Sequence, residues 1–179
     1  MRLRERYKKQ IMPQLKNKFG YNNDLAAPAI KKAVVNVGVG RHSKEKEYID
    51  KVASNLSRIT GQKPVLTKAK KAISAFKTKE GMIIGVAVTL RGKRMYDFLE
   101  KLVCITFPRV RDFRGISEKQ VDKNGNLTIG FRENLAFPEI EVDEIENAHG
   151  LEVCIATTAK NKEEGLGLFR LLGFPFKKE

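Results

Sequence analysis

The chain has 179 residues, of which 41% are hydrophobic and 31% charged, so it is long enough to bury a core without a disulfide scaffold. It contains no run of about 18 apolar residues and its N-terminus is charged, which excludes a membrane-spanning helix and disfavours a secretory signal or a transit peptide. The two cysteines, Cys104 and Cys154, lie in apolar runs, and we expect them to be buried free thiols in a reducing compartment.

Positive charge is concentrated in one half of the chain. The net charge is +14, but residues 1–94 carry 23 basic and 6 acidic side chains, whereas residues 95–179 carry 12 and 15. We expect a single domain over residues 1–179, with a basic half (1–94) that binds nucleic acid and a neutral-to-acidic half (95–179). If the charges only kept the surface solvated, there would be no reason for them to be segregated by segment. Binding to a membrane surface is also disfavoured, because no segment has the exposed apolar face and aromatic anchors of a membrane-surface helix.

The first half of the chain alternates helical and extended patterns. Apolar residues at every fourth position predict a helix over 3–19, kinked at Pro13 and ended by Gly20. The next predicted elements are a strand, a helix, a short strand, a long loop and a strand, over 30–39, 43–60, 64–68, 69–84 and 85–91. The loop is rich in Lys and Ala, and loops of this length are commonly functional, although a floppy hairpin tip has the same composition.

The second half completes an α+β pattern. A helix begins near Met95 and is ended by Pro108, strands span 127–131 and 151–157, and the last helix runs from an Asn161 cap to Gly173. We interpret Gly165 and Gly167 in that helix as packing glycines. Short connections between the middle strands favour antiparallel pairing. The expected fold is an antiparallel β-sheet with helices packed on one face and the long loop between two central strands.

Each predicted strand has two unlike faces, because successive side chains point in opposite directions. One face is bulky, and we expect it to bury against the helices: Val35, Val37, Val39, Val86, Val88, Leu90, Leu127, Ile129 and Phe131. The other face is small or polar, with Asn36, Gly38, Ala87, Thr89 and Arg91. Such a face admits a large rigid ligand, although a solvated face of an antiparallel sheet has the same pattern.

The small face carries no aromatic side chain, which argues against recognition of single-stranded RNA by base stacking. It favours contacts to backbone, ribose and helical shape, in which Asn36, Gln62 and Thr89 would hydrogen-bond 2′-hydroxyl groups. The cations of the loop 69–84 suit a second phosphate-contacting site, and Phe76 is its candidate exposed aromatic.

No pattern in the chain predicts a catalytic centre, a metal site or a cofactor. His42 and His149 are distant in sequence from both cysteines, and the glycines of residues 37–40 lack the rest of a nucleotide-binding fingerprint. The carboxylates of residues 139–146 are best interpreted as a solvated segment or a docking surface for a basic partner. A small phosphatase-like α+β enzyme is the alternative, against which the missing nucleophile and base argue. A protein-only adaptor that uses the acidic segment is a third hypothesis.

Several short motifs occur in one order along nearly the whole chain. They are FGY (19–21), VVNVGVG (34–40), ITGQKP (59–64), TKAKKAI (67–73), VTLRG (88–92), PRVRDFRG (108–115), FPEI (137–140) and LLGFPF (171–176). Together they resemble the bacterial-type family of large-subunit ribosomal protein number five, the 5S rRNA-binding ribosomal proteins. The resemblance implies a non-catalytic structural constituent of the ribosome, in the cytoplasm or in an organelle, without a cofactor.

The resemblance also implies partners and contact residues. Those at the family's 5S rRNA-binding positions are Asn36, Gln62, Thr67, Lys68, Lys70, Lys71, Thr89 and Arg91. A loop of Ser74, Ala75, Phe76, Lys77 and Lys79 would approach the P-site tRNA elbow. The residues implied to face a basic protein of the small-subunit head are Arg109, Arg111, Asp112, Glu141, Asp143 and Glu144. Neighbouring large-subunit rRNA and ribosomal proteins are further implied partners. The chain departs from the family at Cys104 and Cys154 and in its acidic residues 139–146.

Overall fold

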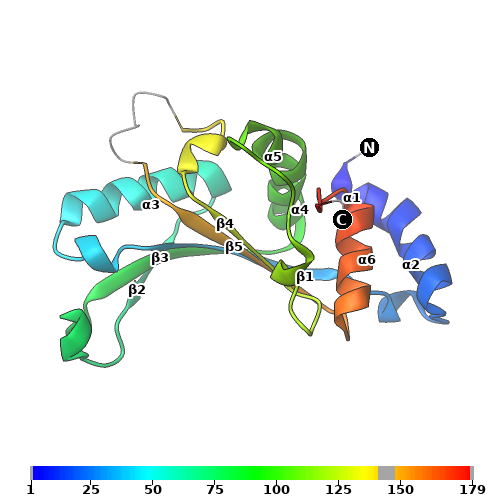
Figure 1. The fold of residues 1–179 in the computed structure, drawn as a ribbon, viewed down its shortest axis with the longest axis horizontal. Coiled ribbons are helices and arrows are strands. Elements are labelled where there is room, and N and C mark those ends of the chain that lie inside the picture. The colour runs from blue at the N-terminus through cyan, green and yellow to red at the C-terminus, as the bar shows by residue number, and fades with distance from the viewer. Residues whose placement is uncertain (1, 141–147, 178–179) are drawn as a thin grey trace. The chain divides into compact units, whose positions relative to one another are not determined.

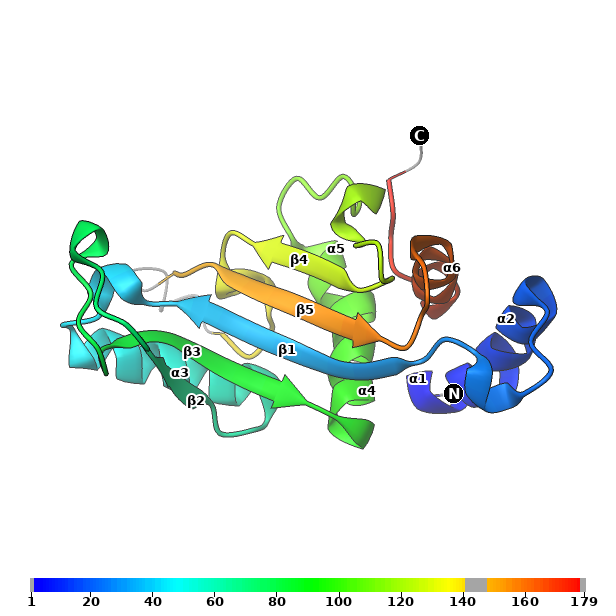
Figure 2. The same cartoon turned by 90° about the horizontal axis from the view of Figure 1, so that it is seen from below.

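The computed structural model describes residues 2–140 and 148–177, and its strands form a five-stranded sheet. The strands are β1 (Ile30–Gly38), β2 (Val65–Lys68), β3 (Ile83–Leu90), β4 (Leu127–Phe131) and β5 (Leu151–Thr157). Their order is β2-β3-β1-β5-β4 with antiparallel neighbours, as the arrowheads in Figure 2 show. The predicted α+β class is confirmed. Because β2 lies at the edge, the loop after it joins an edge strand to its neighbour and not two central strands.

The helices lie close to their predicted ranges. They are α1 (Leu3–Arg6), α2 (Met12–Phe19), α3 (Lys46–Thr60), α4 (Gly92–Lys101), α5 (Phe107–Arg109) and α6 (Lys162–Leu172). The predicted end signals of α6 are confirmed: the Asn161 side chain accepts a hydrogen bond from the Glu164 N–H, and Gly173 adopts a left-handed conformation with φ 93°.

A π-helical turn precedes the proline in both helices that contain one. The turn Tyr7–Ile11 joins α1 to α2 ahead of Pro13, and the turn Leu102–Thr106 joins α4 to α5 ahead of Pro108. Proline lacks an N–H and its ring clashes with the carbonyl four residues earlier, so a wider turn lets the helix continue. The prediction that Pro108 ends its helix is therefore wrong, since α5 continues to Arg109.

The chain forms two compact units. Unit 1 consists of Met1–Ala33, Leu90–Ile129 and Cys154–Glu179, and unit 2 consists of Val34–Thr89 and Gly130–Val153. Each unit therefore contains parts of both the basic and the acidic half of the sequence.

In unit 1, the N-terminal helix packs against α4. The rings of Tyr7 and Tyr96 lie 6.2 Å apart, and the Leu3 N–H donates to the Glu100 carboxylate at 3.4 Å. Cys104 and Cys154 are free, but Cys104 is exposed and Cys154 only half-buried, which corrects the expectation of burial. An amphipathic helix buries only one side of an apolar run, and the other side carries Cys104.

In unit 2, α3 covers one face of the strands (Figure 1). The bulky strand side chains Val35, Val37, Val86 and Val88 are buried, as are Ile49, Val52, Leu56 and Ile59 of α3. The predicted division between a buried bulky face and an uncovered small face is thus confirmed for these strands. The uncovered face holds the candidate site.

Candidate nucleic-acid interface

The candidate interface of unit 2 is the strand face opposite α3. We call it the open face and define it by Val34, Asn36, Gly38, Thr67, Gly85, Ala87 and Thr89. Thr89 and Gly38 are exposed, and Asn36, Thr67 and Ala87 are half-buried. Among the residues that the structure describes, no helix therefore seals the predicted polar residues of this face.

Gly85 brings three strands into close contact at the centre of the open face. A Cβ atom at this position would lie 2.6 Å from Thr67 Oγ1, 3.3 Å from the Val37 carbonyl oxygen and 3.6 Å from Asn36 Oδ1. The Asn36 amide and the Thr67 hydroxyl therefore converge over a backbone that has no side chain. Sequence reasoning did not single out Gly85, although a glycine inside a β-branched strand is the usual sign of such a close approach.

An irregularity in β2 places Lys68 on the open face beside Thr67. Thr67 pairs with Gly85 and Lys68 pairs with Ile83, so the register shifts between two consecutive residues of β2. Paired residues project to the same side of a sheet, and Ile83 and Gly85 share a side because they are two positions apart. The irregularity thus adds an exposed cation to a face from which regular alternation would remove it.

Gln62 is held at the end of β3 by the C-terminal turn of α3. Its Nε2 donates to the Thr89 carbonyl oxygen at 3.1 Å. The Thr60 hydroxyl lies within hydrogen-bond distance of the carbonyl oxygens of Leu56 and Gln62, at 2.7 and 3.2 Å. With its amide group oriented in this way, Gln62 keeps Oε1 as an acceptor beside Thr89.

The predicted long loop over 69–84 is a hairpin with an ordered tip. Ala69 donates to the Met82 carbonyl at 2.8 Å, and Ile73 and Thr78 exchange backbone hydrogen bonds of 3.1 and 3.2 Å. The tip is a 3₁₀ turn, Ser74–Phe76, followed by Lys77 in a left-handed conformation with φ 52°. These hydrogen bonds close the tip into a defined turn.

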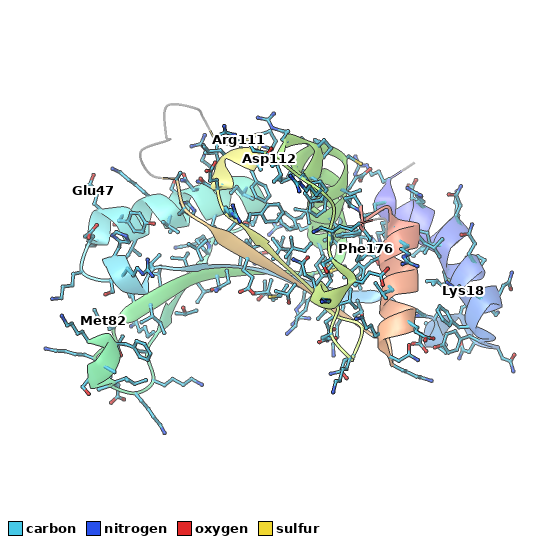
Figure 3. All side chains as sticks on the ribbon, viewed as in Figure 1. Lys18, Glu47, Met82, Arg111, Asp112 and Phe176 are labelled. Carbon is cyan, nitrogen blue, oxygen red and sulfur yellow. The ribbon has the colours of Figure 1, made fainter. Side chains whose placement is uncertain are left out.

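Positive charge surrounds the open face on the hairpin side. The exposed cations there are Lys63, Lys68, Lys70, Lys71, Lys77 and Lys79. By contrast, the outer side of α3 mixes both signs, with a Glu47–Lys51 ion pair of 3.0 Å. Figure 3 shows Glu47 on α3 and Met82 in the hairpin, on opposite sides of the strands. A polyanion is therefore attracted to the hairpin and the open face of unit 2 more than to α3.

The remaining predicted contact residues belong to unit 1 or lie outside the described residues. Arg91 is exposed and directly precedes α4. Arg109, the last residue of α5, is exposed. Arg111 and Asp112, just after the helix, are exposed as well (Figure 3), and Asp112 has φ 53°. The other three predicted small-subunit contacts, Glu141, Asp143 and Glu144, lie outside the described residues.

The part of the chain that the structure describes holds no group of three or more His, Cys, Asp or Glu side chains suited to a metal ion. Within residues 2–140 and 148–177, no helix combines the length and apolar character needed to cross a membrane.

The sequence matches two family descriptions that together span most of the chain. Residues 23–79 match "Ribosomal protein L5", and residues 83–176 match the C-terminus of the same ribosomal protein family. The "Large ribosomal subunit protein uL5" of Halothermothrix orenii is 51% identical over 174 residues, which cover 97% of each chain. The proteins of the same name from Desulfatibacillum aliphaticivorans and Thermoanaerobacter sp. are 52% and 48% identical, with 98% and 99% of each chain covered.

Proposed function

Since the chain belongs to the ribosomal protein L5 family, and is thus a structural component of the large ribosomal subunit and not an enzyme, we propose that it binds 5S rRNA through the open face of unit 2. Family membership confirms two predictions: that the chain is an rRNA-binding ribosomal protein, and that it is located in the ribosome. It also removes the phosphatase-like alternative. We propose that the whole chain acts as one RNA-binding domain.

The close approach of Asn36 and Thr67 over Gly85 is the observation that carries the proposal. An RNA duplex presents 2′-hydroxyl groups and base edges in a wide, shallow minor groove, which a flat face of small polar side chains can approach. Asn36, Gln62 and Thr89 supply donors and acceptors for those hydroxyl groups. Without an aromatic side chain on the open face, recognition depends on shape and ribose contacts and not on stacking.

The cations provide most of the affinity in this proposal. Lys68, Lys70, Lys71 and Arg91 neutralise phosphates and so fix the position of the RNA, while carrying no sequence information themselves. Arg91 follows β3 directly in the chain, two residues after Thr89.

Two further contacts complete the proposal. The hairpin tip, Ser74 to Lys79, approaches the elbow of the P-site tRNA, because its cations and its ordered turn project beyond the paired part of the hairpin. Arg109, Arg111 and Asp112, together with Glu141, Asp143 and Glu144, face a basic protein of the small-subunit head. Neighbouring large-subunit rRNA and ribosomal proteins contact the remainder of the protein surface.

A salt titration of 5S rRNA binding tests the proposal. If about six phosphates are neutralised, the logarithm of the association constant should fall with the logarithm of salt concentration with a slope of roughly −4 to −5. The Lys68→Ala variant should weaken binding and make the slope shallower by roughly 0.7 to 0.9. Lys46→Ala, which removes an exposed lysine of α3, is the matched control and should change neither the affinity nor the salt slope. A slope near zero, or equal affinity for an unrelated RNA of the same length, contradicts the proposal.

A further inference from the structure

We infer that a groove beside the hairpin of unit 2 holds an unpaired nucleotide of 5S rRNA, with its base against Phe76 and its phosphate beside Arg41. The inference rests on the proposed function and adds a stacking site to a surface that otherwise has none. Phe76 belongs to the hairpin tip for which we propose the tRNA contact; we assign its ring to 5S rRNA and leave the tRNA contact to the other residues of the tip.

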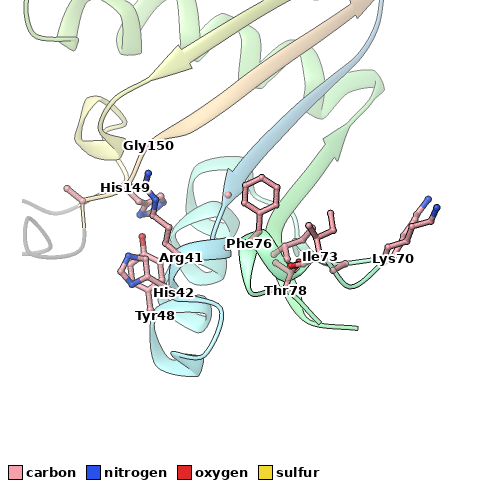
Figure 4. Close-up of a pocket in the computed structure, with 15 residues that line it drawn as sticks. Arg41, His42, Tyr48, Lys70, Ile73, Phe76, Thr78, His149 and Gly150 are labelled. Atoms are coloured by element: carbon pink, nitrogen blue, oxygen red, sulfur yellow. The ribbon is translucent and has the colours of Figure 1, made fainter. Parts of the chain in front are cut away.

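The groove is large and mostly apolar. It encloses about 1100 Å³ and is lined by the turn after β1, by the hairpin and by residues 148–150. In the close-up of Figure 4, Arg41, His42, Tyr48 and His149 lie on one side of the Phe76 ring, and Ile73 and Thr78 lie on the other. Pockets of this kind, apolar with a few polar groups, are typical ligand sites.

The hairpin wall of the groove exposes apolar side chains on an ordered backbone. Phe76 is 76% exposed, Ile73 46% and Ile84 36%. The Ile73–Thr78 bridge and the left-handed Lys77 nevertheless fix the tip that carries the Phe76 ring. A non-glycine residue in this conformation costs about 1–3 kcal/mol and is found where the surrounding structure or a function requires it. Clustered exposed apolar side chains mark a surface that a partner covers.

The opposite wall supplies aromatic rings and a cation. The His42 and Tyr48 rings lie 4.4 Å apart, and Arg41 is exposed beside them. A Cβ atom at Gly40 would meet nothing within 4 Å, so the backbone leaves open space there. The described lining residues include Arg41, Lys70 and Lys71 but no Asp or Glu. A ligand with one flat apolar part and one negative charge complements this lining, and an unstacked nucleotide has both.

The position of the groove favours 5S rRNA over tRNA as the source of that nucleotide. Gly38, the last open-face residue of β1, also lines the groove, so the open face meets the groove at the end of β1, while Ile84 and Tyr48 line it from the α3 side of the strands. Lys70 and Lys71, which we propose as phosphate contacts of 5S rRNA, also lie along the groove. An RNA that rests on the open face therefore reaches the groove without leaving the protein surface.

Substitutions of Phe76 test the inference with the full-length protein and a 5S rRNA transcript. Loss of one base–aromatic stack should weaken binding of Phe76→Ala roughly 5- to 150-fold, with little recovery in Phe76→Leu and near-normal affinity in Phe76→Trp. The salt slope should stay unchanged in all three variants, because no charge is lost. Leu25→Ala, which removes a 92% exposed apolar side chain in unit 1, is the control and should bind normally.

Photocrosslinking identifies the occupant directly. A benzophenone-bearing phenylalanine analogue at position 76 should crosslink to an unpaired nucleotide of 5S rRNA. The inference is overturned if wild type binds 5S rRNA with the expected salt slope while Phe76→Ala binds equally well; the proposed function then stands. Crosslinks to tRNA or to a protein in intact ribosomes also overturn it and assign the groove to that partner. If wild type shows no preference for 5S rRNA, the proposed function fails as well.

Discussion

At the scale of single residues, Gly85 controls how closely β2 and β3 approach on the open face. The φ of Gly85 is not positive, so its backbone conformation does not require glycine. Glycine is required because neighbouring atoms leave no space for a Cβ atom. The atom that a Cβ would meet first is Thr67 Oγ1, at 2.6 Å. Two residues of the proposed RNA surface are therefore coupled by direct contact.

Gly85→Ala should destabilise the protein by about 1–3 kcal/mol, because an added methyl group overpacks the sheet. It should also weaken 5S rRNA binding, since the open face must deform. Thr67→Ala removes the hydroxyl that clashes, so the double variant should recover much of the lost stability. Urea unfolding of the two single variants and the double variant measures this coupling. Additive effects in the double variant would refute the proposed contact.

Ionisation of the Tyr7 hydroxyl should lower the stability of the protein at high pH. The Tyr7 hydroxyl donates to the Pro28 carbonyl at 3.1 Å, and burial, with a smaller contribution from Tyr96, raises its pKa to about 12. The unfolded value is about 10. Because the folded pKa is the higher one, the stabilisation is complete below pH 10 and is lost as the pH rises towards 12.

Tyr7→Phe should lower the free energy of unfolding by about 1 kcal/mol at neutral pH, through loss of one hydrogen bond. Its stability should then fall less steeply than that of wild type between pH 10 and 12. Some pH dependence remains in the variant, because burial and the hydrogen bond to Glu164 raise the pKa of Tyr21 to about 12 as well. Denaturant curves at several pH values test the difference, and parallel profiles would rule out a role for Tyr7.

At the scale of elements, α6 of unit 1 packs against a tight turn through two glycines. A Cβ atom at Gly165 would lie 2.5 Å from Gly125 Cα and 2.6 Å from the Gly125 carbonyl oxygen. Gly125 itself has φ 75° and follows Asp122, whose carboxylate accepts backbone hydrogen bonds from Asn124 and Asn126. The predicted role of Gly165 as a packing glycine is confirmed by this contact.

Gly165→Ala should be strongly destabilising, by about 2–4 kcal/mol, because backbone atoms cannot move aside as a flexible side chain can. Gly130→Ala is the matched control, since a Cβ atom there meets nothing within 4 Å and its φ is not positive. Thermal unfolding should show a clear drop in Tm for Gly165→Ala and almost none for Gly130→Ala. Similar Tm values for both variants would contradict the packing argument.

The elements were predictable wherever a local pattern determines them. The alternation of strand residues assigned Val35 and Val86 to the buried side and Thr89 to the open side. The capping signals at Asn161 and Gly173 located the two ends of α6. Features that depend on pairing between distant segments were not predictable. The contact of Gly85 with Thr67, the register shift that turns Lys68, and the groove around Phe76 all require the strand register. A π-helical turn likewise let a helix pass Pro108.

At the scale of the whole molecule, charge identifies the class of partner but not the surface. The first 94 residues carry a net charge of +17, yet they contribute to both units. Within unit 2, the same half supplies both α3, whose exposed charges are mixed, and the hairpin, whose exposed charges are nearly all positive. The topology, not the composition, places the cations beside the open face.

Lysine acetylation, read by mass spectrometry on the free protein and on its complex with 5S rRNA, tests the location of the RNA most directly. The account predicts that Lys68, Lys70 and Lys71 lose reactivity in the complex. Lys46 and Lys51 on α3 should react equally in both states. Protection of the α3 lysines, with Lys68, Lys70 and Lys71 unchanged, would show that the RNA does not rest on the open face.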